Sequence, residues 1–115
     1  MTVYLNTRLR LLRDLTGESA REIARLAGLR PASHLSVIES GGRPDPRVST
    51  VARIARVYGV TIDWLVVGRG PAFQAAPTLN PRTRKDRRAA AELVRAAVEA
   101  ARAANDNARS TPEAA

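Results

Sequence analysis

The chain has 115 residues, no cysteine and a single histidine, His34, which excludes disulfides, Cys-based zinc sites and a thiol nucleophile. Nineteen Lys and Arg residues against eleven Asp and Glu residues give a net charge of +8 at pH 7, and so basic a chain attracts polyanions such as nucleic acid. The N-terminus lacks the apolar segment of a signal peptide, and the longest apolar stretch is Trp64 to Val67. We therefore expect a cytoplasmic protein without a membrane span.

The first two segments of the chain have the patterns of short helices. Leucines recur at helical spacing in the first segment, and Gly17 ends it. Ser19 followed by Glu22 forms a capping box, which opens a second helix that ends at Gly28. The predicted inward residues of these two helices are Leu5, Leu9, Leu12, Leu15, Ile23, Leu26 and Ala27.

Three further short helices are predicted before residue 70. Pro31 suits the first position of a third helix, which includes Ala32 to Glu39. Gly59 ends a fourth helix, and Thr61 caps a fifth, in which Trp64 is a predicted core residue. The predicted apolar residues of these helices are Leu35, Ile38, Val48, Val51, Ile54, Ala55, Tyr58, Ile62, Trp64 and Leu65. Because no alternating strand pattern occurs, residues 1–69 are predicted to form an all-α bundle of five helices.

The remainder of the chain has a different composition. Residues 70–85 contain three prolines and the basic cluster Arg82 to Lys85, and they are predicted to be a linker. Residues 86–104 are predicted to form an Ala-rich amphipathic helix, and residues 105–115 a flexible tail. A narrow apolar stripe makes this helix a candidate dimer element, with docking on another protein or a mobile tail with non-specific DNA affinity as alternatives. The candidate dimer residues are Leu93, Val94, Ala97, Val98 and Ala101.

The short turn from Gly28 to Pro31 joins the second and third helices in a helix-turn-helix arrangement. The segments that carry a resemblance are Arg8-Leu9-Arg10, Ser19…Glu22-Ile23-Ala24, Ile38-Glu39…Gly41, Ile54-Ala55…Gly59-Val60 and Asp63-Trp64-Leu65. Over roughly residues 5–68 the chain resembles the Cro/repressor-type helix-turn-helix family, which includes phage repressors and xenobiotic-response-element-like regulators. The resemblance implies double-stranded DNA binding through the third helix.

The resemblance also implies which residues contact DNA. Ala20 stands where the family usually has a glutamine that touches a phosphate, and five residues separate Leu29 from Leu35 where the family usually has four. The implied base-contacting residues are Arg30, Ala32, Ser33, Ser36 and Val37. The implied phosphate-contacting residues are Ser19, Ala20, Arg21, His34, Ser40, Arg43 and Arg47. Within the family the glutamate at the position of Glu39 pairs with an arginine of the first helix, and the matching residue here is Arg13.

Three classes of function are compatible with these patterns. The first is a transcriptional regulator, most simply a repressor that binds a palindromic operator as a homodimer. The second is an antitoxin that regulates its own operon and masks a toxin with its C-terminal part. The third is a protein-interaction adaptor that retains the fold. Because the sequence contains no Gly-rich phosphate loop and no carboxylate pair opposite a histidine or nucleophile, we expect no enzymatic activity, no cofactor and no metal.

Overall fold

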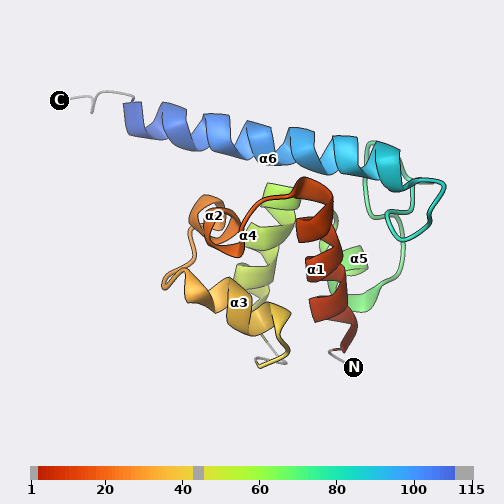
Figure 1. Ribbon diagram of the computed structural model, residues 1–115, viewed down its shortest axis with the longest axis horizontal. Coiled ribbons are helices and arrows are strands. Elements are labelled where there is room, and N and C mark those ends of the chain that lie inside the picture. Colours follow the sequence, from red (N-terminus) through yellow and green to blue (C-terminus); the bar gives the residue numbers. More distant parts are fainter. Residues whose placement is uncertain (1–2, 43–45, 111–115) are drawn as a thin grey trace.

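The computed structural model describes residues 3–42 and 46–110, and all regular secondary structure in these residues is helical. The helices are α1 (Val3–Thr16), α2 (Ala20–Ala27), α3 (Ser33–Glu39), α4 (Val48–Tyr58), α5 (Ile62–Val67) and α6 (Arg87–Ser110). Helices α1 to α5 form a bundle, and α6 lies across one side of it (Figure 1). Within the described ranges, no helix combines the length and apolarity that crossing a bilayer demands.

Most helix ends lie at the predicted caps. The Ser19 hydroxyl accepts a hydrogen bond from the Glu22 N–H at 3.0 Å, and the Thr61 hydroxyl accepts one from the Trp64 N–H at 3.2 Å. Gly28 and Gly59 end α2 and α4 in the left-handed conformation, which costs glycine little because it has no Cβ. The predicted boundaries of α2, α4 and α5 are thus confirmed at these caps.

The predicted start of α3 is wrong by one to two residues. The helix begins at Ser33, with Ala32 as its N-cap residue. Pro31 lies before the helix, and its carbonyl accepts a hydrogen bond from the His34 N–H at 3.0 Å. The proline therefore belongs to a tight turn that precedes α3 and not to the first helical turn.

The core of the bundle contains nearly all the predicted apolar residues. The four predicted inward leucines of α1 are buried, as are Leu35, Ile38 and Trp64. The predicted burial of Val48 is wrong, because Val48 is the first residue of α4 and is 75% exposed. Ile62 is also exposed, by 41%. Val57 is buried although the helical stripe did not predict it, since α4 is covered by α2, α5 and α6 together.

Helix α6 packs on α1, α2 and α4 of its own chain. Val94 and Val98 are almost completely buried there, together with Ala90 and Ala91. The prediction that this stripe pairs with a second subunit is wrong for Val94 and Val98, because the bundle of the same chain already covers them. The predicted tail is also partly wrong, since α6 continues to Ser110.

The segment predicted as a linker is packed against the bundle. Ala72, Phe73 and Pro81 are buried, although the composition of this segment predicted only a linker. The Thr61 N–H donates to the Ala72 carbonyl at 2.9 Å, and the Asn80 N–H donates to the Asp86 carboxylate at 3.0 Å. These contacts fix the path of the chain between α5 and α6.

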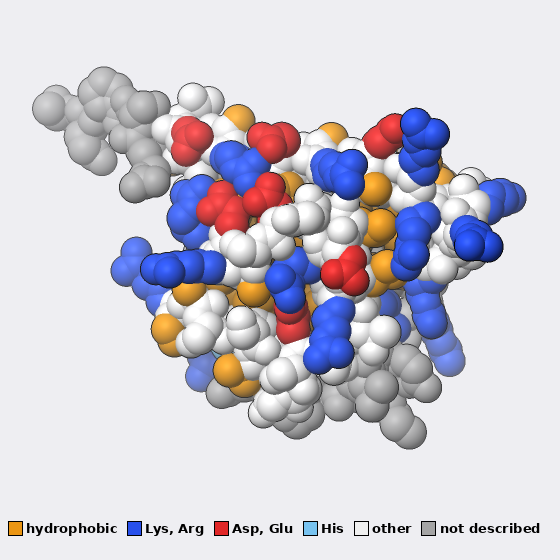
Figure 2. Space-filling model, viewed as in Figure 1, with side chains coloured by type: hydrophobic (Ala, Val, Ile, Leu, Met, Phe, Trp, Pro, Cys, Tyr) orange, Lys and Arg blue, Asp and Glu red, His pale blue; other side chains and the backbone are white. Residues whose placement is uncertain are grey.

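A charged cluster joins the C-terminal half of α6 to the start of α2. The Arg102 guanidinium binds Glu18 at 2.9 Å and Glu22 at 3.2 Å, and it also pairs with Glu99 of its own helix. Figure 2 shows acidic and basic side chains gathered where α6 passes over α2. Hydrogen bonds from Arg25 and then Arg102 lower the pKa of Glu22 to about 2, against the opposing effect of burial.

The pKa of Glu22 predicts an acid-dependent loss of stability. Because its folded pKa of about 2 lies below its ordinary value of 4.5, Glu22 stabilises the fold fully above about pH 5 and loses this contribution as the pH falls towards 2. The difference in melting temperature between the wild type and Glu22→Gln should therefore be largest at pH 6 and shrink towards zero near pH 2. The exposed Glu92 provides the control variant, Glu92→Gln. A difference for Glu22→Gln that does not change with pH would contradict the ion cluster.

A second prediction concerns the close approach of α6 to the end of α4. A Cβ added at Gly59 would lie 2.8 Å from the Ala97 Cβ, whereas one added at Gly28 would meet no atom within 4 Å. Both glycines have a positive φ, so alanine at either position carries a similar backbone cost of about 1–2 kcal/mol. Gly59→Ala should lower the free energy of unfolding more than Gly28→Ala, and Ala97→Gly should relieve the excess in a double variant. Equal losses, measured by urea denaturation, would show that α6 is not in contact at this point.

Candidate nucleic-acid interface

The α2–α3 unit presents one side of α3 to solvent. Gly28 ends α2 in the left-handed conformation, and the buried Leu29 anchors the following turn to the core. Leu35 and Ile38 are buried on one side of α3, which leaves the opposite side of the helix exposed to solvent. Figure 1 shows α3 on the side of the bundle that faces away from α6. This placement leaves α3 accessible to a large ligand.

Most of the predicted base-contacting residues lie on this free surface. Arg30, Ser33 and Ser36 are exposed, and Val37 is exposed by 42% although it is apolar. Ala32 is the exception, because as the N-cap residue of α3 it is half-buried against the core. Its prediction as a base-contacting residue is not supported by this position.

The predicted phosphate-contacting residues are in more varied positions. Arg21 and Arg47 are exposed, whereas Ala20 packs against the core. The Ser19 hydroxyl caps α2, and the Ser40 hydroxyl donates to the Val37 carbonyl at 2.9 Å. Arg43, which is also predicted to contact a phosphate, lies outside the described residues.

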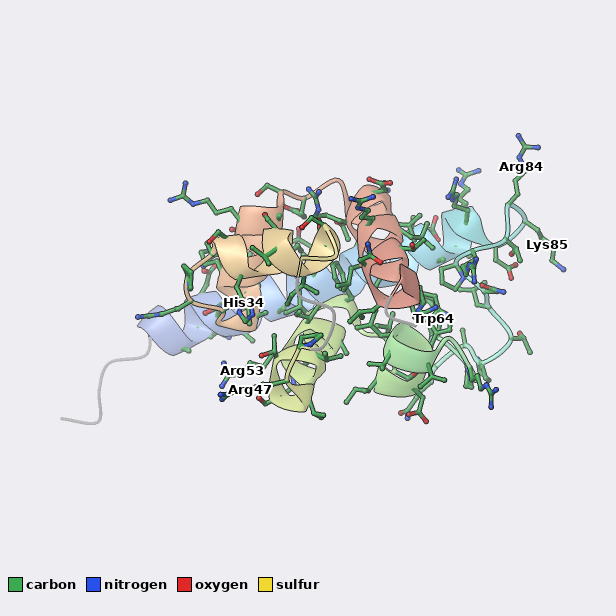
Figure 3. All side chains as sticks on the ribbon, turned by 90° about the horizontal axis from the view of Figure 1, so that it is seen from below. His34, Arg47, Arg53, Trp64, Arg84 and Lys85 are labelled. Carbon is green, nitrogen blue, oxygen red and sulfur yellow. The ribbon has the colours of Figure 1, made fainter. Side chains whose placement is uncertain are left out.

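A basic cleft lies beside the N-terminal end of α3. His34 of α3 is near Arg53 of α4 and near Arg47, the N-cap residue of α4 (Figure 3). Arg30 of the turn before α3 completes the group. The cleft has a volume of about 350 Å³. Its lining residues are Gly28, Leu29, Arg30, His34, Arg47, Ser49, Thr50 and Arg53.

Arg53, Ser49 and Thr50 were not predicted as site residues. In the sequence they look like the ordinary polar side of an amphipathic helix, and nothing in their spacing relates them to His34. The Arg53 Nη1 lies 3.5 Å from the Gly28 carbonyl oxygen, which places its guanidinium next to the α2–α3 turn. Only the packing of α4 against this turn brings them together.

Glu39 and Arg13 form the ion pair expected between α3 and α1. The Arg13 Nε donates to the two carboxylate oxygens of Glu39 at 2.9 and 3.0 Å, and Glu39 is only 4% exposed. Burial raises the pKa of Glu39, and the charge of Arg13 opposes this rise. The pair connects the C-terminal end of α3 to α1 and so orients the exposed side of α3.

A double-mutant cycle tests this pair. We expect Glu39→Ala to lower both the melting temperature and the affinity for DNA, because it leaves Arg13 without its carboxylate and loosens α3. The coupling energy between Glu39→Ala and Arg13→Ala should be about 0.5–3 kcal/mol. Asp14→Ala, which removes an exposed carboxylate beside Arg13, is the matched control. Strictly additive changes in the free energy of unfolding for the two substitutions would contradict an interaction between Arg13 and Glu39.

Comparison with protein-family models identifies the family of the chain. A family model described as a helix-turn-helix domain matches residues 5–65, which is more than half of the chain. Searches of curated proteins and of solved structures found no match. The matched residues run from α1 into α5 and include the whole α2–turn–α3 unit. The chain therefore belongs to the helix-turn-helix domain family.

Proposed function

We propose that this protein is a sequence-specific double-stranded DNA-binding regulator that places α3 in the major groove. The observation that carries the proposal is the exposed side of α3, which displays Ser33, Ser36 and Val37 beside a group of arginines. The family match supports it, because the second helix of a helix-turn-helix pair, which is α3 here, enters the major groove of DNA. The net charge of +8 supports it as well, because cationic side chains attract the phosphate backbone of DNA.

The residues on this surface allow a modest but definite readout of bases. Ser33 and Ser36 can donate to or accept from base edges, and Val37 can contact a thymine methyl group. Arg30, at the start of the turn, is the candidate for a stronger contact, either to a base edge or to a phosphate. Affinity in this proposal comes chiefly from phosphate contacts, among which Arg21 and Arg47 are exposed.

The finer part of the proposal is a repressor that binds a palindromic operator as a homodimer, within the Cro/repressor-type class. Because the apolar stripe of α6 is buried, the dimer surface is assigned instead to α5, where Ile62, Val66 and Val67 are each exposed by 40–58%. Contact between two copies of α5 would relate two α3 helices by a two-fold axis, as a palindrome requires. Because the bundle of the same chain covers the apolar stripe of α6, the structure favours this interpretation over a toxin-masking role of that stripe.

Selection of bound duplexes from a random pool tests this proposal. We expect an enriched sequence with two inverted half-sites about one helical turn apart, roughly 34 Å between centres. Sedimentation of the protein on the selected duplex should give two chains per site. An enriched sequence without two-fold symmetry would contradict the dimer, and a pool without any enrichment would contradict specific DNA binding.

A further inference from the structure

The cleft between the α2–α3 turn and α4 has an unusual concentration of positive charge. Three guanidinium groups line it from three different places: Arg30 in the turn, Arg47 at the N-cap of α4, and Arg53 within α4. His34 lines it from α3. None of the described lining residues is acidic, so no lining carboxylate balances these charges.

The chemistry of the cleft fits an oxyanion with several acceptor oxygens. Each guanidinium is permanently charged and offers N–H groups in a planar fork that matches a phosphate. The hydroxyls of Ser49 and Thr50 lie in the first turn of α4, an eleven-residue helix whose N-terminal N–H groups favour negative charge. A bound anion would also relieve the mutual repulsion of the three arginines.

The cleft differs in this respect from the other basic cluster of the molecule. Arg84 and Lys85 project outward from the loop before α6, away from the bundle (Figure 3). By contrast, His34, Arg47 and Arg53 border a shared volume of about 350 Å³, near the lower end of the roughly 300–1,000 Å³ typical of small-molecule sites. The convergence of the donors, and not the amount of charge, distinguishes the cleft.

We propose that this cleft binds a phosphate group, with Arg53 as its central ligand and Arg30, Arg47 and His34 around it. The phosphate comes either from the DNA backbone beside the groove that holds α3 or from a small phosphorylated molecule. The first source rests on the proposed function, whereas phosphate binding itself does not.

Titration of the full-length protein with inorganic pyrophosphate, followed by amide NMR shifts at constant ionic strength, tests the site. We expect the largest shifts in residues 28–34 and 47–53, and at least a fivefold loss of affinity in Arg53→Ala. Arg56→Ala is the matched control, because Arg56 is an exposed arginine of the same helix outside the cleft. Shifts centred on residues 82–88, or equal affinities in the two variants, would overturn the proposal.

DNA binding by the same variants identifies the source of the phosphate. If the backbone supplies it, Arg53→Ala weakens binding to all duplexes alike and lowers the salt slope by about one, and pyrophosphate competes with DNA. If a small molecule supplies it, Arg53→Ala loses pyrophosphate binding and keeps its affinity for DNA. A wild type that binds pyrophosphate in the cleft but no DNA would refute the proposed function and leave the site standing.

Discussion

A Val94→Asp variant is expected to lose at least about 3 kcal/mol of its free energy of unfolding. Val94 is completely buried where α6 packs on the bundle. A carboxylate at this position would be removed from water into apolar surroundings. The loss is a large share of the roughly 5–15 kcal/mol that stabilises a small domain. Urea denaturation followed by circular dichroism measures it.

Ala96→Asp is the matched control for this prediction. Ala96 lies two residues further along α6 and is exposed, so the same charge change there should cost little. Similar losses in both variants would show that α6 does not pack on the bundle in solution. Ending the chain at Gly70 is a poorer test of the role of α6, because it would also expose the apolar surface that α6 covers.

A Ser36→Glu variant is expected to lose DNA affinity on the order of 100-fold, which is about 2.7 kcal/mol. Ser36 lies on the exposed side of α3, and a carboxylate there would be held against base edges and phosphates in the groove. Its melting temperature should remain within a few degrees of the wild type, since the side chain is outside the core. Fluorescence anisotropy with a selected duplex measures the affinity.

Ala100→Glu adds the same charge on the exposed side of α6 and is the control for Ser36→Glu. It lies on the helix that crosses the opposite side of the bundle from α3 (Figure 1), so its effect should be only the small loss due to net charge. If both variants lost affinity equally, the loss would reflect total charge and not a role of α3.

Local signals explain why the helices could be predicted. Ser19, Thr61 and the glycines at 28 and 59 act on their own helix ends, so the sequence alone contains the information needed to place them. The leucine stripe of α1 is similarly local. The start of α3 was less predictable, because Pro31 suits both a first helical turn and the tight turn that it forms.

Contacts between distant segments could not be predicted in the same way. The stripe of α6 indicates that the helix packs against an apolar partner, but a pattern of Ala and Val does not say whether that partner is another chain or its own bundle. Phe73 became a core residue because the segment after α5 folds back, as the hydrogen bond between the Thr61 N–H and the Ala72 carbonyl shows.

Arg8 illustrates the same limit for a charged residue. In the sequence it belongs to the arginines interleaved with the leucines of α1, which suggests an exposed side chain. In the structure it is 3% exposed, and its guanidinium donates to the Leu65 carbonyl at 2.7 Å and the Val66 carbonyl at 2.9 Å. It thus satisfies two carbonyls at the end of α5, a function that depends on a helix more than fifty residues away. Arg53 likewise lines the basic cleft because α4 packs beside the α2–α3 turn, which is distant in the sequence.

The central claim, that the exposed side of α3 specifies the DNA sequence, is tested most directly by duplex selection with the wild type and with Ser36→Gln in parallel. Glutamine can form a bidentate contact with adenine, whereas serine cannot. We predict that the two enriched sequences differ at the same base pair of each half-site, with adenine favoured by the variant, and agree elsewhere. Identical enriched sequences from the two proteins would contradict the placement of α3 in the major groove.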